Sequence, residues 1–216
     1  MIKKVIGIHF SPAGGTALMT GRLVEEIASV LRECSPEEIT TECLDINRTE
    51  GIGFGDDTVA VIAMPAYIGK LPLPGIRALR AISGGKAMTV TAVSYGGRSY
   101  GNALYELNDI AEECGFTVIG AGAFAISYMA RRGSSRSSAP AMDSPAIAEF
   151  GRAASSKIRR LGGCEIEGLR VRPAPLEVKG RKPVHRISKI SPKAAELAQG
   201  LLAKVNLRKK SSEWFL

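Results

Sequence analysis

Five short apolar runs alternate with segments that place apolar residues at helical spacing, and this alternation most restricts the fold. Each run is bounded by turn residues, as expected for buried strands. Alternating strands and helices predict a parallel sheet with helices on both faces, connected by right-handed crossovers. The strands are predicted at residues 4–10, 39–46, 58–64, 87–94 and 116–126, and the helices at 17–34, 74–82, 100–114, 145–161 and 192–205. In such sheets, ligands bind at the carboxyl ends of the strands, at a topological switch point.

The loop after the first strand, residues 11–16 (SPAGGT), has the composition of an anion site. Its two glycines allow close backbone approach, and the next helix begins with amide groups that lack intrahelical partners. No basic residue lies between His9 and Arg22, so these dipoles would hold a phosphate without a counter-charge. The absence of a Gly-Lys-Ser/Thr ending excludes a Walker-type loop.

The positive charge is confined to the C-terminal third of the chain. The net charge is +8, yet residues 1–150 carry 13 Lys and Arg against 16 Asp and Glu. Residues 151–216 carry 16 against 5, a net charge of +11. This asymmetry predicts a tail that meets an acidic partner, or a solvated surface. Because no nucleic-acid recognition motif accompanies it, no nucleic-acid partner is expected.

The cysteines, the histidines and the hydropathy of the chain argue against metal-binding and membrane-spanning classes of protein. The four cysteines show no CxxC spacing and there are two histidines, so neither a metal site nor an iron–sulfur cluster is expected. No apolar run approaches the roughly 18–20 residues of a membrane span. The N-terminus leads directly into the first strand without a signal-peptide pattern, so a cytoplasmic location with reduced thiols is expected.

Four motifs together resemble the flavodoxin-like FMN-binding family. Residues 11–16 resemble the flavodoxin phosphate loop, [Ser/Thr]-x-Thr-Gly-x-Thr, with Ala13 in place of its middle Thr. Residues 64–72 (MPAYIGKLP) and 94–107 (SYGGRSYGNALYEL) are similar to the second and third loops of clostridial-type flavodoxin–ferredoxin fusion proteins. Residues 120–124 (GAGAF) are similar to their fifth strand, so the resemblance covers about residues 1–165.

The resemblance implies a five-stranded parallel sheet in the order 2-1-3-4-5. It divides the chain into a flavodoxin-like FMN-binding domain at 1–165 and a basic C-terminal extension at 166–216, with a terminal helix. The ferredoxin half is expected to be absent, because no cysteine follows Cys164. Electrons would therefore pass to a separate molecule.

The resemblance also implies the residues that bind FMN without a covalent bond. The phosphate would lie on the first loop, where the missing hydroxyl at Ala13 removes a bond worth about 0.5–1.5 kcal/mol. The flavin ring would lie between the second and third loops, with Tyr67, Tyr95 and Tyr100 as candidates to contact it. The full implied set is Ser11, Ala13, Gly14, Gly15, Thr16, Ala17, Pro65, Ala66, Tyr67, Ile68, Gly69, Ser94, Tyr95, Gly96, Gly97, Arg98 and Tyr100.

The implied function is an electron-transfer protein that receives electrons from one oxidoreductase and delivers them to another. The basic tail would dock the partner, and no side chain need act as an acid or base. The alternative with the same cofactor is an FMN-dependent NAD(P)H oxidoreductase acting on a small acceptor.

A serine hydrolase is the remote alternative. Residues 92–96 (AVSYG) lie close to a G-x-S-x-G elbow, and Asp143 and His185 follow Ser94 in triad order. However, Ala92 replaces the first glycine, and no oxyanion-loop motif precedes it.

Overall fold

The computed structural model describes residues 2–35, 38–49, 52–96, 99–127, 141–162, 165–166, 169–170, 176–180 and 212–216. Five strands form a parallel sheet in the order β2-β1-β3-β4-β5, which is the flavodoxin-like order that the sequence predicted. They are β1 (Lys4–His9), β2 (Thr40–Asp45), β3 (Thr58–Pro65), β4 (Met88–Tyr95) and β5 (Thr117–Ser127). Each starts and ends within about two residues of the predicted run, because a buried apolar segment defines it.

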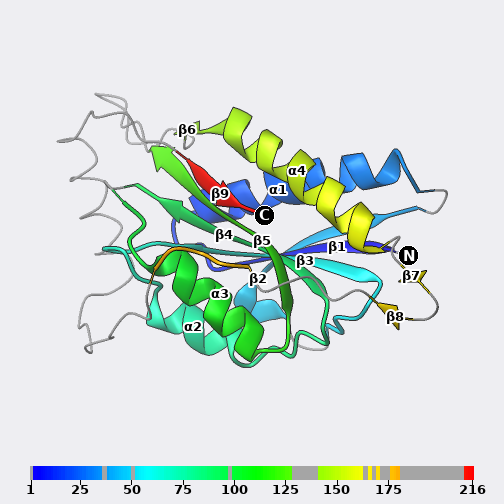
Figure 1. Cartoon of the computed structure of the whole chain (residues 1–216). Coiled ribbons are helices and arrows are strands. Elements are labelled where there is room, and N and C mark those ends of the chain that lie inside the picture. Colours follow the sequence, from blue (N-terminus) through cyan, green and yellow to red (C-terminus); the bar gives the residue numbers. More distant parts are fainter. Residues whose placement is uncertain are drawn as a thin grey trace.

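Two helices cover each face of the sheet (Figure 1). Helices α1 (Gly15–Arg32) and α4 (Ser144–Gly162) lie on one face, and α2 (Leu73–Leu79) and α3 (Ala103–Glu113) lie on the other. Helix α3 begins three residues later than predicted, since Gly101 has a φ of 56° that no α-helix accepts. Within the described ranges, no helix is long and apolar enough to cross a membrane. The predicted helix at 192–205 lies outside the described residues.

The prediction of a purely parallel, five-stranded sheet is incomplete. Two short antiparallel strands, β6 (Ala141–Met142) and β9 (Glu213–Phe215), pair with the outer edge of β5, so that this sheet has seven strands among the described residues. They cover backbone groups of an edge strand that would otherwise be open to other chains. The remaining short elements are η1 (Ile46–Arg48), β7 (Glu165–Ile166) and β8 (Leu169–Arg170), of which the last two form a separate antiparallel pair.

The core consists of two apolar layers, one on each face of the sheet. Alternate residues of β1 divide between them: Val5 packs with α1 and α4, and Ile6 packs with α2 and α3. Every residue of β3 is buried, as expected for a central parallel strand covered on both faces. This sandwich aligns the carboxyl ends of β1, β3 and β4 at one edge.

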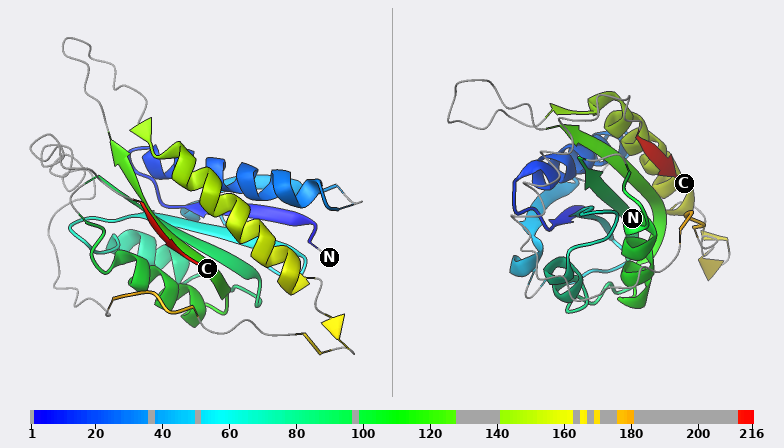
Figure 2. Two further views of the ribbon diagram at one scale, coloured as in Figure 1. Left: turned by 45° about the horizontal axis from the view of Figure 1, so that its top comes forward. Right: turned by 90° about the vertical axis from the view of Figure 1, so that its left-hand side faces the viewer.

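The C-terminal extension lies on the domain at two described places. Leu176 and Val178 pack against the core on the α2 and α3 side. The final residues return to β5 as β9, drawn in red beside it in Figures 1 and 2. The last residues of the chain therefore belong to the same sheet as the first strand.

Candidate functional site

The loop after β1 presents backbone amides at its open end. Gly14 is the N-cap of α1 with a φ of 82°, and the Ser11 hydroxyl accepts a hydrogen bond from the Ala17 amide at 2.9 Å. The amides of Gly15 and Thr16, in the first helical turn, donate to no acceptor among the described residues. Unpaired amides at a helix N-terminus are donors for an anion. The loop that the sequence predicted to hold a phosphate therefore ends in two backbone amides without an acceptor among the described residues.

Ser94, at the end of β4, connects the three loops. Its hydroxyl lies 2.8 Å from the Thr16 hydroxyl, and both side chains are almost fully buried. Its carbonyl accepts a hydrogen bond of 2.8 Å from the Ala66 amide, which follows β3. The loops after β1, β3 and β4 are thereby joined at the carboxyl ends of their strands. The Ser11 hydroxyl accepts from the Ala17 amide and keeps its own hydrogen for a ligand, whereas the Thr16 hydroxyl is paired with Ser94. The Ser11 hydroxyl and the two unpaired amides are therefore the donors that this loop can offer.

The loop after β3 is a tight turn under backbone strain. Tyr67 and Lys70 exchange two backbone hydrogen bonds, of 2.8 and 3.1 Å. Both central residues have positive φ, 52° at Ile68 and 75° at Gly69, and Ile68 is 72% exposed. A β-branched residue in this conformation costs about 1–2 kcal/mol. Strain of this kind concentrates at ligand sites and switch regions.

The loop after β4 is packed directly against this turn. A Cβ at Gly101 would lie 2.6 Å from the Gly69 Cα, so only glycine fits there. The Asn102 amide donates to the Gly69 carbonyl at 2.9 Å. A second link joins the same segments: the buried Glu106 carboxylate of α3 accepts a hydrogen bond of 3.0 Å from the Leu71 amide, which follows the turn. The second loop and the described end of the third loop, residues 99–102, are therefore packed together as one unit.

The three candidate tyrosines lie in different surroundings. Tyr67 is partly exposed, whereas Tyr95 is 5% exposed and packs against Tyr100 with ring centroids 5.7 Å apart. The Tyr100 hydroxyl donates to Glu213 at 2.6 Å. Burial raises the pKa of Tyr95, and burial together with the Glu213 hydrogen bond raises the pKa of Tyr100. Both phenols are therefore neutral at physiological pH. Tyr67 and Tyr100 are both half-buried, and the Tyr67 hydroxyl lies on the buried side of its ring.

His9 ends β1 directly before the first loop. Burial lowers the pKa of its imidazole, and Asp45 on the neighbouring strand only partly opposes this effect. The side chain is therefore neutral at pH 7, and it brings no positive charge to the loop. This agrees with a site that holds an anion through dipoles.

The predicted residues that the structure describes gather at one edge of the sheet. Pro65 and Gly96 lie at the ends of β3 and β4 with the residues above, and Ala13 is exposed on the first loop. Gly97 and Arg98 lie outside the described residues. Sequence reasoning assigned no role to Gly101, Glu106 or Glu213. Glu106 lies within the motif at residues 94–107, so the sequence could have indicated its role. Glu213 is 113 residues from its partner Tyr100, and no local sequence pattern indicates the contact.

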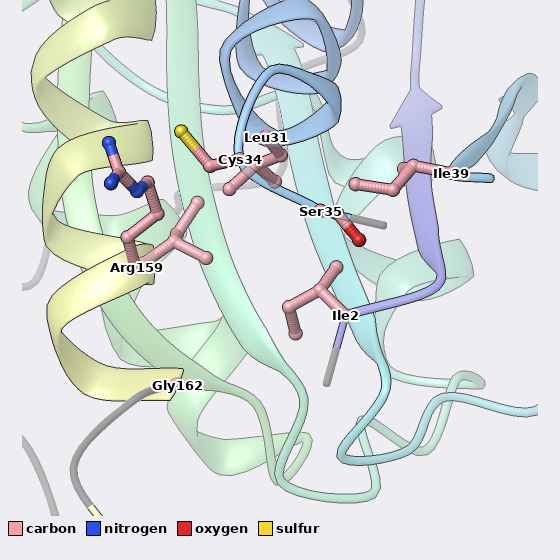
Figure 3. Close-up of a pocket in the computed structure, with 8 residues that line it drawn as sticks. Ile2, Leu31, Cys34, Ser35, Ile39, Arg159 and Gly162 are labelled. Atoms are coloured by element: carbon pink, nitrogen blue, oxygen red, sulfur yellow. The ribbon is translucent and has the colours of Figure 1, made fainter. Parts of the chain in front are cut away.

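A pocket of about 200 Å³ lies at the opposite edge, between the last turns of α1 and α4 (Figure 3). Its floor is apolar, with Cys34, Ser35 and Arg159 among its lining residues. Ile2 precedes β1 and Ile39 precedes β2, so the pocket lies at the amino ends of these strands. It is separate from the three loops. In the described part of the chain, no three His, Cys, Asp or Glu side chains gather as metal ligands would.

The hydrolase geometry is not assembled among the described residues. Ser94 is 5% exposed and bonded to Thr16. Asp143 caps α4 through the Ala146 amide and accepts a second hydrogen bond, of 2.9 Å, from Ser212. His185 lies outside the described residues.

No protein-family model and no curated protein matches this sequence. Among solved structures, an oxidoreductase from Corynebacterium diphtheriae is similar, with a TM-score of 0.51 and 13% identity over 74% of this chain and 98% of that one. A flavodoxin from the domain Archaea has a TM-score of 0.45 and 15% identity over 72% and 99%. A WrbA-like flavodoxin from Agrobacterium tumefaciens has a TM-score of 0.43 and 11% identity over 74% and 99%.

These likenesses concern the fold. The first shows that the chain shares its α/β fold with a protein described as an oxidoreductase. Strand order gives the same result independently, since β2-β1-β3-β4-β5 is the flavodoxin-like arrangement. The chain therefore has a flavodoxin-like α/β fold, with three connected loops at the topological switch point of its sheet.

Proposed function

We propose that this chain binds FMN without a covalent bond and transfers electrons between two other oxidoreductases. The observation that carries the proposal is the joining of the three loops through Ser94 at the carboxyl edge of the sheet. Ligands of doubly wound sheets bind at this edge. The clostridial-type sequence motifs fall on the same three loops, and they point to FMN within this fold.

The first loop suits a phosphate group. It offers the amides of Gly15 and Thr16, and a Cβ at Gly14 would meet no atom of the described residues within 4 Å. Tyr67 and the exposed Ile68 lie on the second loop, where the ring would bind. When bound, FMN supplies the redox chemistry, and the protein sets its potential through nearby charge and hydrogen bonds.

The electron donor and acceptor would be separate proteins. The first 150 residues carry a small negative net charge, whereas residues 151–216 carry +11, which favours a partner with an acidic face. Such docking would be salt-dependent, because attraction between exposed charges is screened. The electron-transfer rate to the physiological partner should therefore fall as ionic strength rises.

The direct test is the absorption spectrum of the purified full chain, followed by titration of the flavin-free protein with FMN. We expect flavin absorption bands and saturable, one-to-one binding. The variant Ala13→Glu places a carboxylate beside the phosphate and should weaken binding by about tenfold or more, which equals ~1.4 kcal/mol. Ala13→Gln has the same size without the charge and is the matched control. A colourless protein that ignores added FMN would refute the proposal.

The second candidate is an FMN-dependent NAD(P)H oxidoreductase. The similar structure with the higher TM-score carries the name oxidoreductase, and the same three loops would serve either function. Anaerobic mixing of the FMN-loaded protein with NADH or NADPH separates the two. Reduction of the flavin at catalytic rates favours the enzyme, and no reduction by either nucleotide favours the carrier.

A further inference from the structure

The C-terminal strand β9 brings a carboxylate to the third loop of the candidate site. Glu213, Trp214 and Phe215 pair with Ala123, Gly122 and Ala121 of β5 in antiparallel register. Both views in Figure 2 show β9, in red, lying along β5. Strand β9 therefore lies beside β5, and β5 lies beside β4. Strand β4 ends at Tyr95, where the third loop begins.

The anchoring of β9 does not depend on the Glu213 side chain. Trp214 packs against Phe150 of α4, with ring centroids 6.1 Å apart. Phe215 packs against the core on the opposite face of the sheet. At the start of the strand, the Ser212 hydroxyl donates to Asp143 at 2.9 Å. These contacts hold β9 in place, which leaves the exposed Glu213 side chain available for another task.

That side chain meets the aromatic pair of the third loop. Its carboxylate accepts a short hydrogen bond of 2.6 Å from Tyr100, whose ring packs on the buried Tyr95. Glu213 and Asp143 are the carboxylates whose charge raises the pKa of Tyr95, after the larger effect of burial. The pair is therefore neutral, oriented, and next to a fixed negative charge.

We propose that Glu213 is a positioning residue of the flavin site, which orients Tyr100 in the third loop and adds negative charge beside the flavin. The inference rests on the proposed function. A carboxylate near the ring disfavours the addition of electrons to it, so Glu213 should lower the midpoint potential of bound FMN. The C-terminal strand is thereby a functional part of the site as well as an edge cover.

The first experiment needs no FMN. In proton NMR spectra at neutral pH, a tyrosine hydroxyl in a short hydrogen bond to a carboxylate should give a protected, downfield signal. We expect this signal in the wild-type protein, its loss in Tyr100→Phe, and a marked upfield shift in Glu213→Gln. An unchanged signal in Glu213→Gln would overturn the proposed contact.

The second experiment measures the midpoint potential of FMN bound to the full chain. Glu213→Gln should shift the potential upward, and this shift should be smaller in the Tyr100→Phe background. Glu177→Gln is the matched control, because it removes one charge from an exposed position of the same extension and should leave the potential unchanged. Equal shifts in the two glutamine variants, or none, would overturn the inference while leaving FMN binding intact. Failure of the wild-type protein to bind FMN would instead refute the proposed function.

Discussion

The first loop and the unit formed by the second and third loops differ in how they are held. The first loop is open: residues 12–14 are exposed, the Ser11 hydroxyl accepts from the Ala17 amide, and two amides of the first helical turn have no acceptor among the described residues. The other unit is closed: Gly69 and Gly101 touch, Glu106 holds Leu71, and Tyr100 reaches the C-terminal strand. A helix terminus provides a phosphate site by itself, whereas a surface for a flat ring needs contacts between distant segments.

The largest expected difference in stability is between alanine variants of Gly101 and Gly14, which both have positive φ. Gly101→Ala should destabilise the protein by about 2–4 kcal/mol, because its Cβ meets backbone as well as suffering the strained φ. Gly14→Ala should cost only about 1–2 kcal/mol, since the first loop has open space there. Denaturant unfolding of both variants measures the difference. Equal losses of stability would show that the closed unit is no more crowded than the first loop.

The buried carboxylate of α3 gives the next largest effect. Glu106→Ala leaves the Leu71 amide without its acceptor and should cost about 1.5–3 kcal/mol of unfolding free energy. Glu106→Gln retains an oxygen acceptor and should recover much of this loss. Glu112→Ala, at an exposed position of the same helix, is the control and should be nearly neutral. If Glu106→Ala is as neutral as Glu112→Ala, the second loop does not depend on this hydrogen bond.

The link between the first loop and β4 should be weaker. Thr16→Val removes one member of the buried Thr16–Ser94 hydroxyl pair and leaves the other unsatisfied. A double-mutant cycle with Ser94→Ala should give a coupling energy of about 0.5–1.5 kcal/mol. Strictly additive losses of stability would contradict a direct bond between the two hydroxyls.

The smallest effect concerns pH. The pKa of His9 is lowered by burial from its ordinary value of 6.5, so the unfolded chain binds its proton at higher pH than the folded protein does. The contribution of His9 to stability should be complete above pH 6.5 and decline as the pH falls through the folded pKa. Unfolding curves of the wild-type protein and His9→Gln, measured across this range, should differ in their pH slope. Identical slopes would place His9 in an environment like that of the unfolded chain.

The open loop and the closed unit also differ in how well the sequence predicted them. The five parallel strands and the loop at residues 11–16 are defined by local signals: apolar runs, two glycines and a helix start. Strands β6 and β9 are only two and three residues long, and β9 pairs with a strand about 90 residues earlier in the sequence, so no local pattern indicates them. The burial of Tyr95 likewise depends on Tyr100, whose own hydroxyl bonds to the far end of the chain.

The central claim is that the first loop binds the phosphate of a flavin nucleotide. Isothermal titration of the flavin-free protein with FMN and with riboflavin, which lacks the phosphate, tests it most directly. FMN should bind at least about tenfold more tightly than riboflavin, a difference of ~1.4 kcal/mol or more from hydrogen bonds to the phosphate. Equal affinities for the two ligands, or no binding of either, would contradict the claim.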